Sequence, residues 1–111
     1  MVSLADKYTY KVEWSEEDQY FIGRCIEFSS LGSHGRTKEK ALQEISKVVA
    51  ETIKWLKEEN EEIPVPLSMK QYSGKLTLRL PPDIHKMVET NAALQGISIN
   101  KYIVSTITKY R

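Results

Sequence analysis

The amino-acid sequence predicts an α+β protein in two parts: a small N-terminal β-β-β-α-β domain, and a tail of one strand and two helices. Three observations lead to this fold class. Apolar and polar residues alternate near the N-terminus, apolar residues take helical spacing from residue 37, and a strand pattern returns after a proline-rich stretch. We expect one helix to pack on an antiparallel sheet in the first part, and the tail to dimerise through its strand.

Two stretches near the N-terminus have the alternation of half-buried strands. Residues 8–14, YTYKVEW, place aromatic residues and valine on one face and polar residues on the other. Residues 20–28, YFIGRCIEF, are rich in aromatic and β-branched side chains, and the intervening SEEDQ has turn composition. The sequence therefore predicts an antiparallel hairpin, followed by a loop or short third strand at residues 29–37.

A long amphipathic helix is predicted after Thr37, a residue that favours the N-cap position. Its apolar stripe consists of Ala41, Leu42, Ile45, Val48, Val49, Thr52, Ile53 and Leu56. The following IPVPL is assigned as the last strand of the domain, on an edge because of its two prolines, with an extended linker as the alternative. We place the first domain at residues 1–68, a linker at 69–74 and the tail at 75–111.

The composition favours a soluble, cytoplasmic protein. The chain of 111 residues is 41% hydrophobic and has no apolar run of membrane-spanning length and no secretory signal pattern. Residues 1–71 contain 10 Lys and Arg against 13 Asp and Glu, a balance of −3, whereas residues 72–111 contain 6 against 2, a balance of +4. A basic tail on an acidic body indicates that the tail is the part that meets a polyanion.

The strand predicted at residues 75–80, KLTLRL, has no neighbouring strand in the sequence to pair with. A helix follows Pro81-Pro82 and ends at Gly96, and Ser98 caps a second helix. Because about forty residues rarely bury enough apolar surface to fold alone, we expect two copies to pair this strand about a two-fold axis. The predicted dimer core consists of Leu76, Leu78, Leu80, Ile84, Val88 and Ile103.

The other side of the paired strands would be basic. A two-stranded ribbon fits the DNA major groove, where such side chains reach base edges, and the predicted base contacts are Lys75, Thr77 and Arg79. The free backbone amides at the start of the second helix suit a phosphate, and the predicted phosphate contacts are Ser98, Asn100 and Lys101. The alternative is that the strand residues form the solvated face of an ordinary edge strand.

The tail resembles the ribbon-helix-helix domain that ends many HicB-type antitoxins, especially in RLPP, QGIS and NKYI. The front half is similar to the HicB N-terminal domain, a partial RNase H-like fold, in YFIGRCIEF, in EKAL and in Gly32, Gly35 and Thr37. Where that family often has two acids before Ala-Leu, this chain has Glu39-Lys40.

The resemblance implies a two-part function. The N-terminal domain would bind and block a HicA-like toxin that cleaves mRNA, through residues that the sequence does not identify, and the ribbon-helix-helix dimer would repress the operon of both proteins. Assembly of dimers into tetramers stays open. The alternative is a free-standing transcription regulator whose N-terminal domain senses a ligand or another protein.

Enzymatic activity is not expected, and neither is a metal or cofactor. Glu13 and Glu27 lie on adjacent predicted strands, as metal-holding carboxylates of a nuclease would, but no third carboxylate stands at a strand end. His34 and His85 are interpreted as surface residues, because no metal-ligand spacing joins them. Cys25 is the single cysteine, and we expect it to be packed inside the domain.

Overall fold

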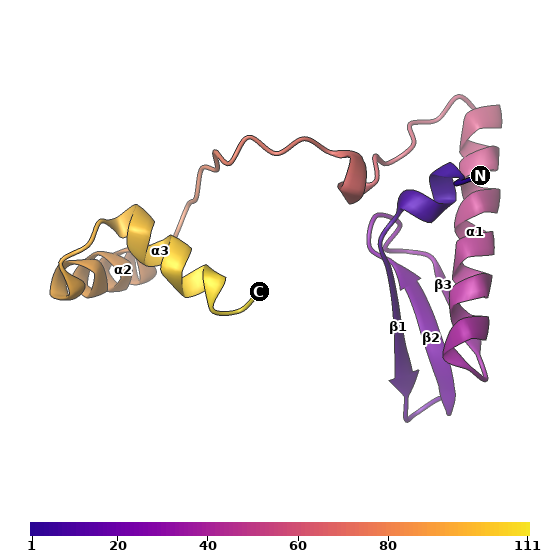
Figure 1. The fold of residues 1–111 in the computed structure, drawn as a ribbon, viewed down its shortest axis with the longest axis horizontal. Helices are drawn as coiled ribbons and strands as arrows, with labels where there is room; N and C mark the ends of the chain where they lie inside the picture. The colour runs from indigo at the N-terminus through magenta and orange to yellow at the C-terminus, as the bar shows by residue number, and fades with distance from the viewer. The chain divides into compact units, whose positions relative to one another are not determined.

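The computed structural model describes all residues from 1 to 111 and confirms the α+β class. The chain divides into two compact units, Met1–Tyr72 and Ser73–Arg111, which are described separately. The helices and strands (Figure 1) are the 3₁₀ helix η1 (Leu4–Lys7), β1 (Tyr10–Ser15), β2 (Tyr20–Cys25), β3 (Gly32–Gly35), α1 (Lys38–Glu58), the 3₁₀ helix η2 (Leu67–Met69), α2 (Pro82–Gln95) and α3 (Ile99–Thr108). No helix is both long and apolar enough to cross a membrane.

The first unit contains a three-stranded antiparallel sheet in the order β1-β2-β3. The predicted hairpin is confirmed, and its register pairs Tyr10 with Cys25 and Ser15 with Tyr20. At the turn, Gln19 has a φ of 59° and its backbone amide donates to the Ser15 carbonyl at 2.8 Å. Residues 32–35 form the short third strand, paired only with β2, so β3 is an edge strand.

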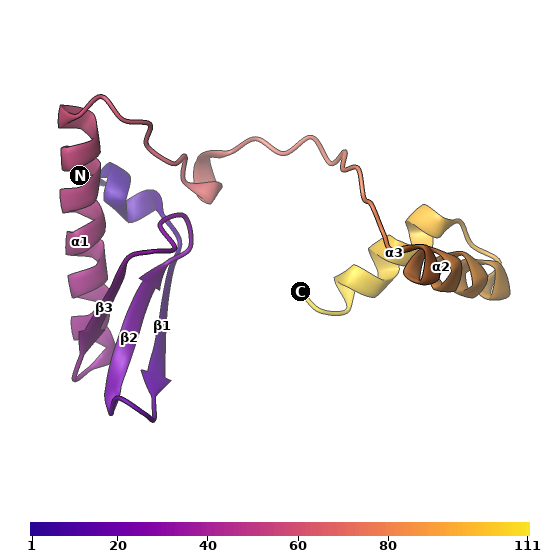
Figure 2. The same cartoon turned by 180° about the vertical axis from the view of Figure 1, so that it is seen from behind.

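Helix α1 covers one face of the sheet (Figures 1 and 2). Its start is as predicted: Thr37 is the N-cap, and its hydroxyl oxygen accepts a hydrogen bond from the Lys40 amide at 3.1 Å. The stripe facing the sheet is narrower than the sequence indicates, because Leu42 is 43% exposed. The buried helix residues are Ala41, Ile45, Val49 and Ile53.

Two glycines allow α1 to approach the sheet closely. A Cβ atom at Gly23 would lie 2.7 Å from the Ala41 carbonyl oxygen, and one at Gly35 would lie 2.6 Å from the Ala41 backbone nitrogen. Neither backbone contact relaxes by a simple rotamer change. These positions therefore require glycine for the helix to keep its distance from β2 and β3.

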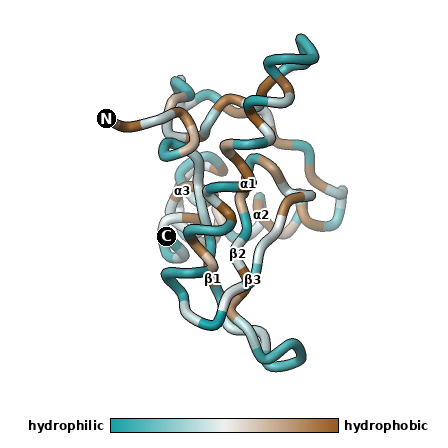
Figure 3. Tube along the Cα trace, turned by 90° about the vertical axis from the view of Figure 1, so that its right-hand side faces the viewer, coloured by the Kyte–Doolittle hydropathy of each residue, from teal (hydrophilic) through white to brown (hydrophobic).

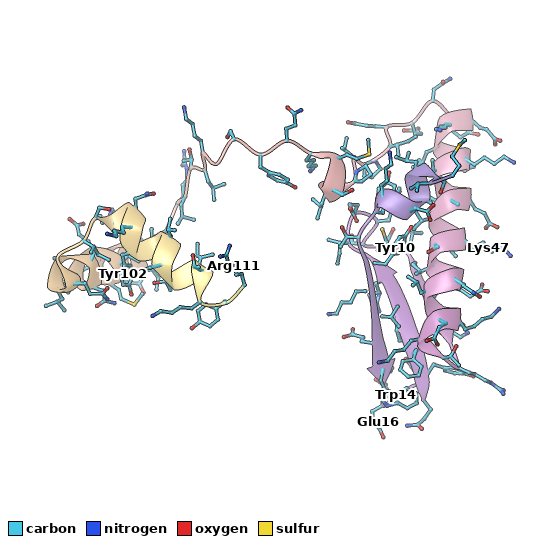
Figure 4. All side chains as sticks on the ribbon, in the orientation of Figure 1. Tyr10, Trp14, Glu16, Lys47, Tyr102 and Arg111 are labelled. Carbon is cyan, nitrogen blue, oxygen red and sulfur yellow. The ribbon has the colours of Figure 1, made fainter.

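The core of the first unit lies between the sheet and α1, and its buried members are Ala5, Tyr8, Cys25, Phe28, Ile45, Val49 and Ile53. Cys25 is 1% exposed, and its burial raises the thiol pKa, in agreement with its predicted packing role. Tyr10 is partly buried and packs against this core, and Figure 4 labels it on the sheet side of α1, with Lys47 on the opposite side of the helix. Hydrophobic and hydrophilic residues alternate along much of the trace (Figure 3).

Removal of the α1 cap has a predictable cost. Thr37→Ala leaves the Lys40 amide without its side-chain acceptor and is expected to lower the free energy of unfolding by about 1 kcal/mol. Urea denaturation followed by tryptophan fluorescence measures this change, since Trp14 and Trp55 both lie in the first unit. Thr37→Ser keeps the hydroxyl and serves as the control; an equal loss in both variants would contradict a capping role.

The predicted strand after α1 is wrong. Asn60 takes a left-handed conformation with a φ of 54°, and residues 61–66 then run without regular structure to η2. Pro64 and Pro66 cannot donate ladder hydrogen bonds, so side chains hold the segment instead. The Tyr8 hydroxyl donates to the Pro64 carbonyl at 2.5 Å, and the Ser68 hydroxyl donates to the Lys7 carbonyl at 2.6 Å.

The second unit consists of the predicted helix pair. Gly96 ends α2 with a φ of 68°, a conformation that glycine adopts without the strain of a Cβ atom. Ser98 caps α3, and its hydroxyl oxygen accepts from the Lys101 amide at 3.0 Å. Both ends were predicted from the sequence, because caps depend on local chemistry alone.

Candidate nucleic-acid interface

Residues 75–80 make no backbone–backbone hydrogen bond and are not assigned as a strand; the Lys75 amide donates only to the Ser73 hydroxyl, at 3.1 Å. Their leucines are exposed, with 89% of Leu76 and 52% of Leu78 accessible. A strand needs a hydrogen-bonded neighbour, and one copy of the chain offers none at this place. The strand pairing between two copies therefore stays a prediction.

The second unit leaves an apolar groove of about 260 Å³. Its lining residues come from the extended segment and from both helices: Leu78, Leu80, Met87, Val88, Tyr102, Ile103, Thr106 and Ile107. Four of the six predicted dimer-core residues are among them. Of the other two, Leu76 lies in the open and Ile84 is 36% exposed.

Little apolar surface is buried within one copy of this unit. Val88 and Ala92 of α2 are its buried residues, and α3 has none. A hydrogen bond of 3.1 Å from the Asn91 amide group to the Tyr102 hydroxyl joins the two helices, and Figure 4 labels Tyr102 on α3. Ile107 remains 63% exposed and Tyr110 85% exposed. A core of this size is small for a unit of about forty residues.

The predicted base-contacting residues Lys75, Thr77 and Arg79 are exposed, and neither cation forms an ion pair within the chain. They stand at every second position, so an extended backbone directs their side chains to one face. Gly74 precedes them with a φ of 83°, a value that places a sharp change of direction just before the segment.

The predicted phosphate contacts lie together at the start of α3. Ser98 is the cap, and Asn100 and Lys101 are exposed in the first turn. The Lys101 amide donates a hydrogen bond to the Ser98 hydroxyl oxygen. The first two helix amides, those of Ile99 and Asn100, have no intrahelical acceptor and point out of the helix. Two amides and one lysine ammonium group can therefore meet an anion here.

Glu13 lies on β1, but Glu27 lies beyond the end of β2 and not on the adjacent strand as predicted, and both carboxylates are engaged in other contacts. Glu13 lies 3.4 Å from the Lys11 ammonium group, and Glu27 accepts hydrogen bonds from neighbouring backbone. No three His, Cys, Asp or Glu side chains lie close enough together to hold a metal ion. His34 stacks on Tyr20 with ring centroids 5.2 Å apart, and His85 lies 3.7 Å from the Glu89 carboxylate.

Glu27 forms hydrogen bonds that hold the connecting segment, residues 59–74, against the N-terminal part of the chain, a role that the sequence did not reveal. Its carboxylate accepts from the Thr9 amide at 3.0 Å and from the Leu67 amide at 2.9 Å. Partial burial alone would raise the pKa of Glu27, but hydrogen bonds from the Leu67 and Thr9 amides outweigh burial and lower the pKa from 4.5. These partners come from distant parts of the chain, so no local pattern marks the residue.

Glu27→Gln is expected to destabilise the first unit by about 1 kcal/mol at pH 7, because a neutral amide accepts these hydrogen bonds less strongly. Since the folded-state pKa is lowered, the wild-type carboxylate contributes fully above pH 4.5, and this contribution is lost as the pH falls through the folded value. Urea denaturation at pH 7 and in acid measures the difference. Exposed Glu13→Gln is the control, and a gap between wild type and Glu27→Gln that does not shrink in acid would contradict this role.

Comparison with known protein families gives a match to part of the chain. The HicB family model matches residues 57–107, which comprise the end of α1, the connecting segment and most of the second unit. The sheet and most of α1 lie outside the matched residues. No significant match was found among curated proteins or among solved structures.

Proposed function

We propose that the chain is a HicB-family antitoxin. In this proposal, the second unit forms a ribbon-helix-helix dimer that binds operator DNA, and the first unit binds and neutralises a HicA-like toxin that cleaves mRNA. The observation that carries the proposal is the family match over residues 57–107, and HicB similarity is consistent with a role in a toxin–antitoxin pair.

The exposed apolar surface of the second unit supports the dimer. Two copies that pair residues 75–80 would place Leu78 and Leu80 of each over the groove lined by Val88, Ile103 and Ile107. Such pairing buries leucines that one copy leaves open to solvent, and the hydrophobic gain would offset the cost of association.

The charge pattern supports DNA as the ligand of the paired strands. Lys75, Thr77 and Arg79 of both copies would line one face of the ribbon, and the +4 balance of residues 72–111 favours approach to a polyanion. The start of α3 would contact a phosphate on either side and fix the ribbon in the groove.

The toxin-binding role rests on the sequence resemblance of the first unit and on its acidic balance, which favours a basic partner. Co-expression with the product of a short neighbouring reading frame tests it: the two proteins should co-purify, and the growth defect caused by the neighbour alone should disappear. DNA binding upstream of the chain's own gene, without any such neighbour or neutralisation, would favour a free-standing regulator instead.

A further inference from the structure

The outer edge of β3 has unpaired backbone groups that are arranged for self-association. In the sheet, the Ile26 amide donates to the Thr9 carbonyl at 2.9 Å. Because antiparallel pairs alternate, this bond and the printed register make Ser33 and Gly35 the residues of β3 that hydrogen-bond to β2. The backbone N–H and C=O groups of Gly32 and His34 therefore point away from the sheet.

This edge lacks the features that prevent pairing with another strand. Residues 32–35, GSHG, contain no proline and no charged side chain, and the register shows no bulge. The other edge strand, β1, has the Lys11–Glu13 ion pair on its solvent face and is therefore better protected. The two glycines of β3 also leave room for a second backbone to come close.

A groove of about 580 Å³ runs beside this edge. One wall is β3 with Arg36, and the other is the row Lys40, Glu44 and Val48 of α1, whose members follow one another at intervals of four residues. Lys40 and Glu44 form an ion pair of 3.3 Å on this wall. The groove is therefore bounded by unpaired backbone and the Arg36 cation on one side, and by one cation and one anion on the other.

We infer that β3 pairs antiparallel with β3 of a second copy, about a two-fold axis at Ser33. In this register, Gly32 and His34 of one copy exchange about four backbone hydrogen bonds with His34 and Gly32 of the other, and no backbone group of the short strand is left over. The result is one continuous six-stranded sheet built from two three-stranded sheets.

Charge complementarity favours a second copy over another partner. The Ser33 hydroxyl donates to the Ala41 carbonyl at 2.8 Å, so an axis at Ser33 lies at the level of α1 between Lys40 and Glu44. The two-fold axis then places Lys40 of each copy opposite Glu44 of the other. A wall with both signs of charge is complementary to itself in this orientation, whereas a strongly basic or strongly acidic strand would meet one like charge.

An edge of four residues is too short to hold two proteins together unaided. If the tail dimerises as proposed above, it raises the effective concentration of the second β3 edge and makes the short contact sufficient. If the two β3 edges of one tail-linked dimer pair with each other, the assembly stays a dimer. If β3 edges of different dimers pair, larger assemblies form.

Cross-linking of the full chain tests the inference. Ser33 lies on the axis at a non-hydrogen-bonded pair, where two strands bring facing residues closest together. In a Cys25→Ala background, Ser33→Cys should shift under mild oxidation to twice the chain mass on a denaturing, non-reducing gel. Glu13→Cys in the same background is the matched control on β1 and should remain at single mass.

Two blocking variants extend the test. His34→Pro removes an outward N–H, and Gly32→Lys adds an edge lysine at a position where a new Cβ meets nothing closer than 3.7 Å. Either change, combined with Ser33→Cys, should abolish the cross-link while circular dichroism stays that of the folded chain. Operator binding is measured separately and reports on the proposed function of the tail. The β3 pairing and the DNA-binding role can therefore fail independently.

The inference is overturned if Ser33→Cys stays at single mass in the folded chain, or if Glu13→Cys cross-links as strongly. It is also overturned if Ser33→Cys forms a mixed disulfide with a cysteine-bearing co-expressed neighbour in preference to itself, because the edge would then belong to the other protein.

Discussion

Leu78→Lys is expected to abolish dimerisation and, with it, operator binding. Leu78 lines the apolar groove of the second unit, which the second copy would cover in the proposed dimer. A lysine there would place a charge in the shared leucine layer at a cost of roughly 3 kcal/mol or more, which corresponds to about a 100-fold weaker dimer. Sedimentation equilibrium of the full chain measures the association constant, and gel-shift titration measures the loss of DNA binding.

The adjacent residue provides the control for this variant. Thr77→Lys introduces the same side chain on the opposite face of the segment, where the proposal places DNA, and should leave the association constant unchanged. If Leu78→Lys associates like the wild type while Thr77→Lys does not, the faces of the segment are assigned the wrong way round. If neither variant changes association, the proposed pairing of residues 75–80 between two copies is wrong.

Arg79→Ala is expected to weaken operator binding by about 1 to 3 kcal/mol, because an arginine can make a bidentate hydrogen bond to a base edge in the major groove. The chain should remain dimeric and should still neutralise the toxin, because Arg79 lies in the second unit and the toxin role is proposed for the first. Fluorescence anisotropy with operator and with shuffled DNA measures both the loss of affinity and the loss of specificity.

Lys86→Ala is a matched control for charge, since Lys86 is an exposed cation of α2 outside the proposed interface. A loss of the same size for both variants would indicate general electrostatic attraction without base recognition. Equal loss of DNA binding and of toxin neutralisation in Arg79→Ala would contradict the assignment of the two activities to different units.

Element boundaries set by local chemistry were predictable from the sequence. Thr37 and Ser98 cap their helices through hydrogen bonds to an amide three residues later, and Gly96 ends α2 in the left-handed region that glycine favours. In each case the residue type and its immediate neighbours contain the whole signal. The hairpin was predictable for a related reason: apolar and polar residues alternate over about six residues, and this alternation indicates which face of each strand is buried.

Features that depend on distant residues were not predictable. The need for glycine at position 23 comes from the backbone of α1, and the role of Glu27 comes from an amide at position 67. The expected last strand failed because the side chains of Tyr8 and Glu27 hold that segment in place of a ladder. A single chain gives no test of the strand at residues 75–80, because its hydrogen-bonding partner would belong to another copy.

The Glu27 contact has a further consequence for how far apart the two activities can act. With Leu67 held at the first unit, the connection to the second unit is only residues 70–74, which can span at most about 18 Å when fully extended. If this contact opens together with the Tyr8–Pro64 and Ser68–Lys7 hydrogen bonds, the free connection begins after α1 instead, and residues 59–74 can span about 55 Å. The hydrogen bonds of Glu27, Tyr8 and Ser68 together therefore set the maximum length of the free connection between the part proposed to hold a toxin and the part proposed to hold DNA.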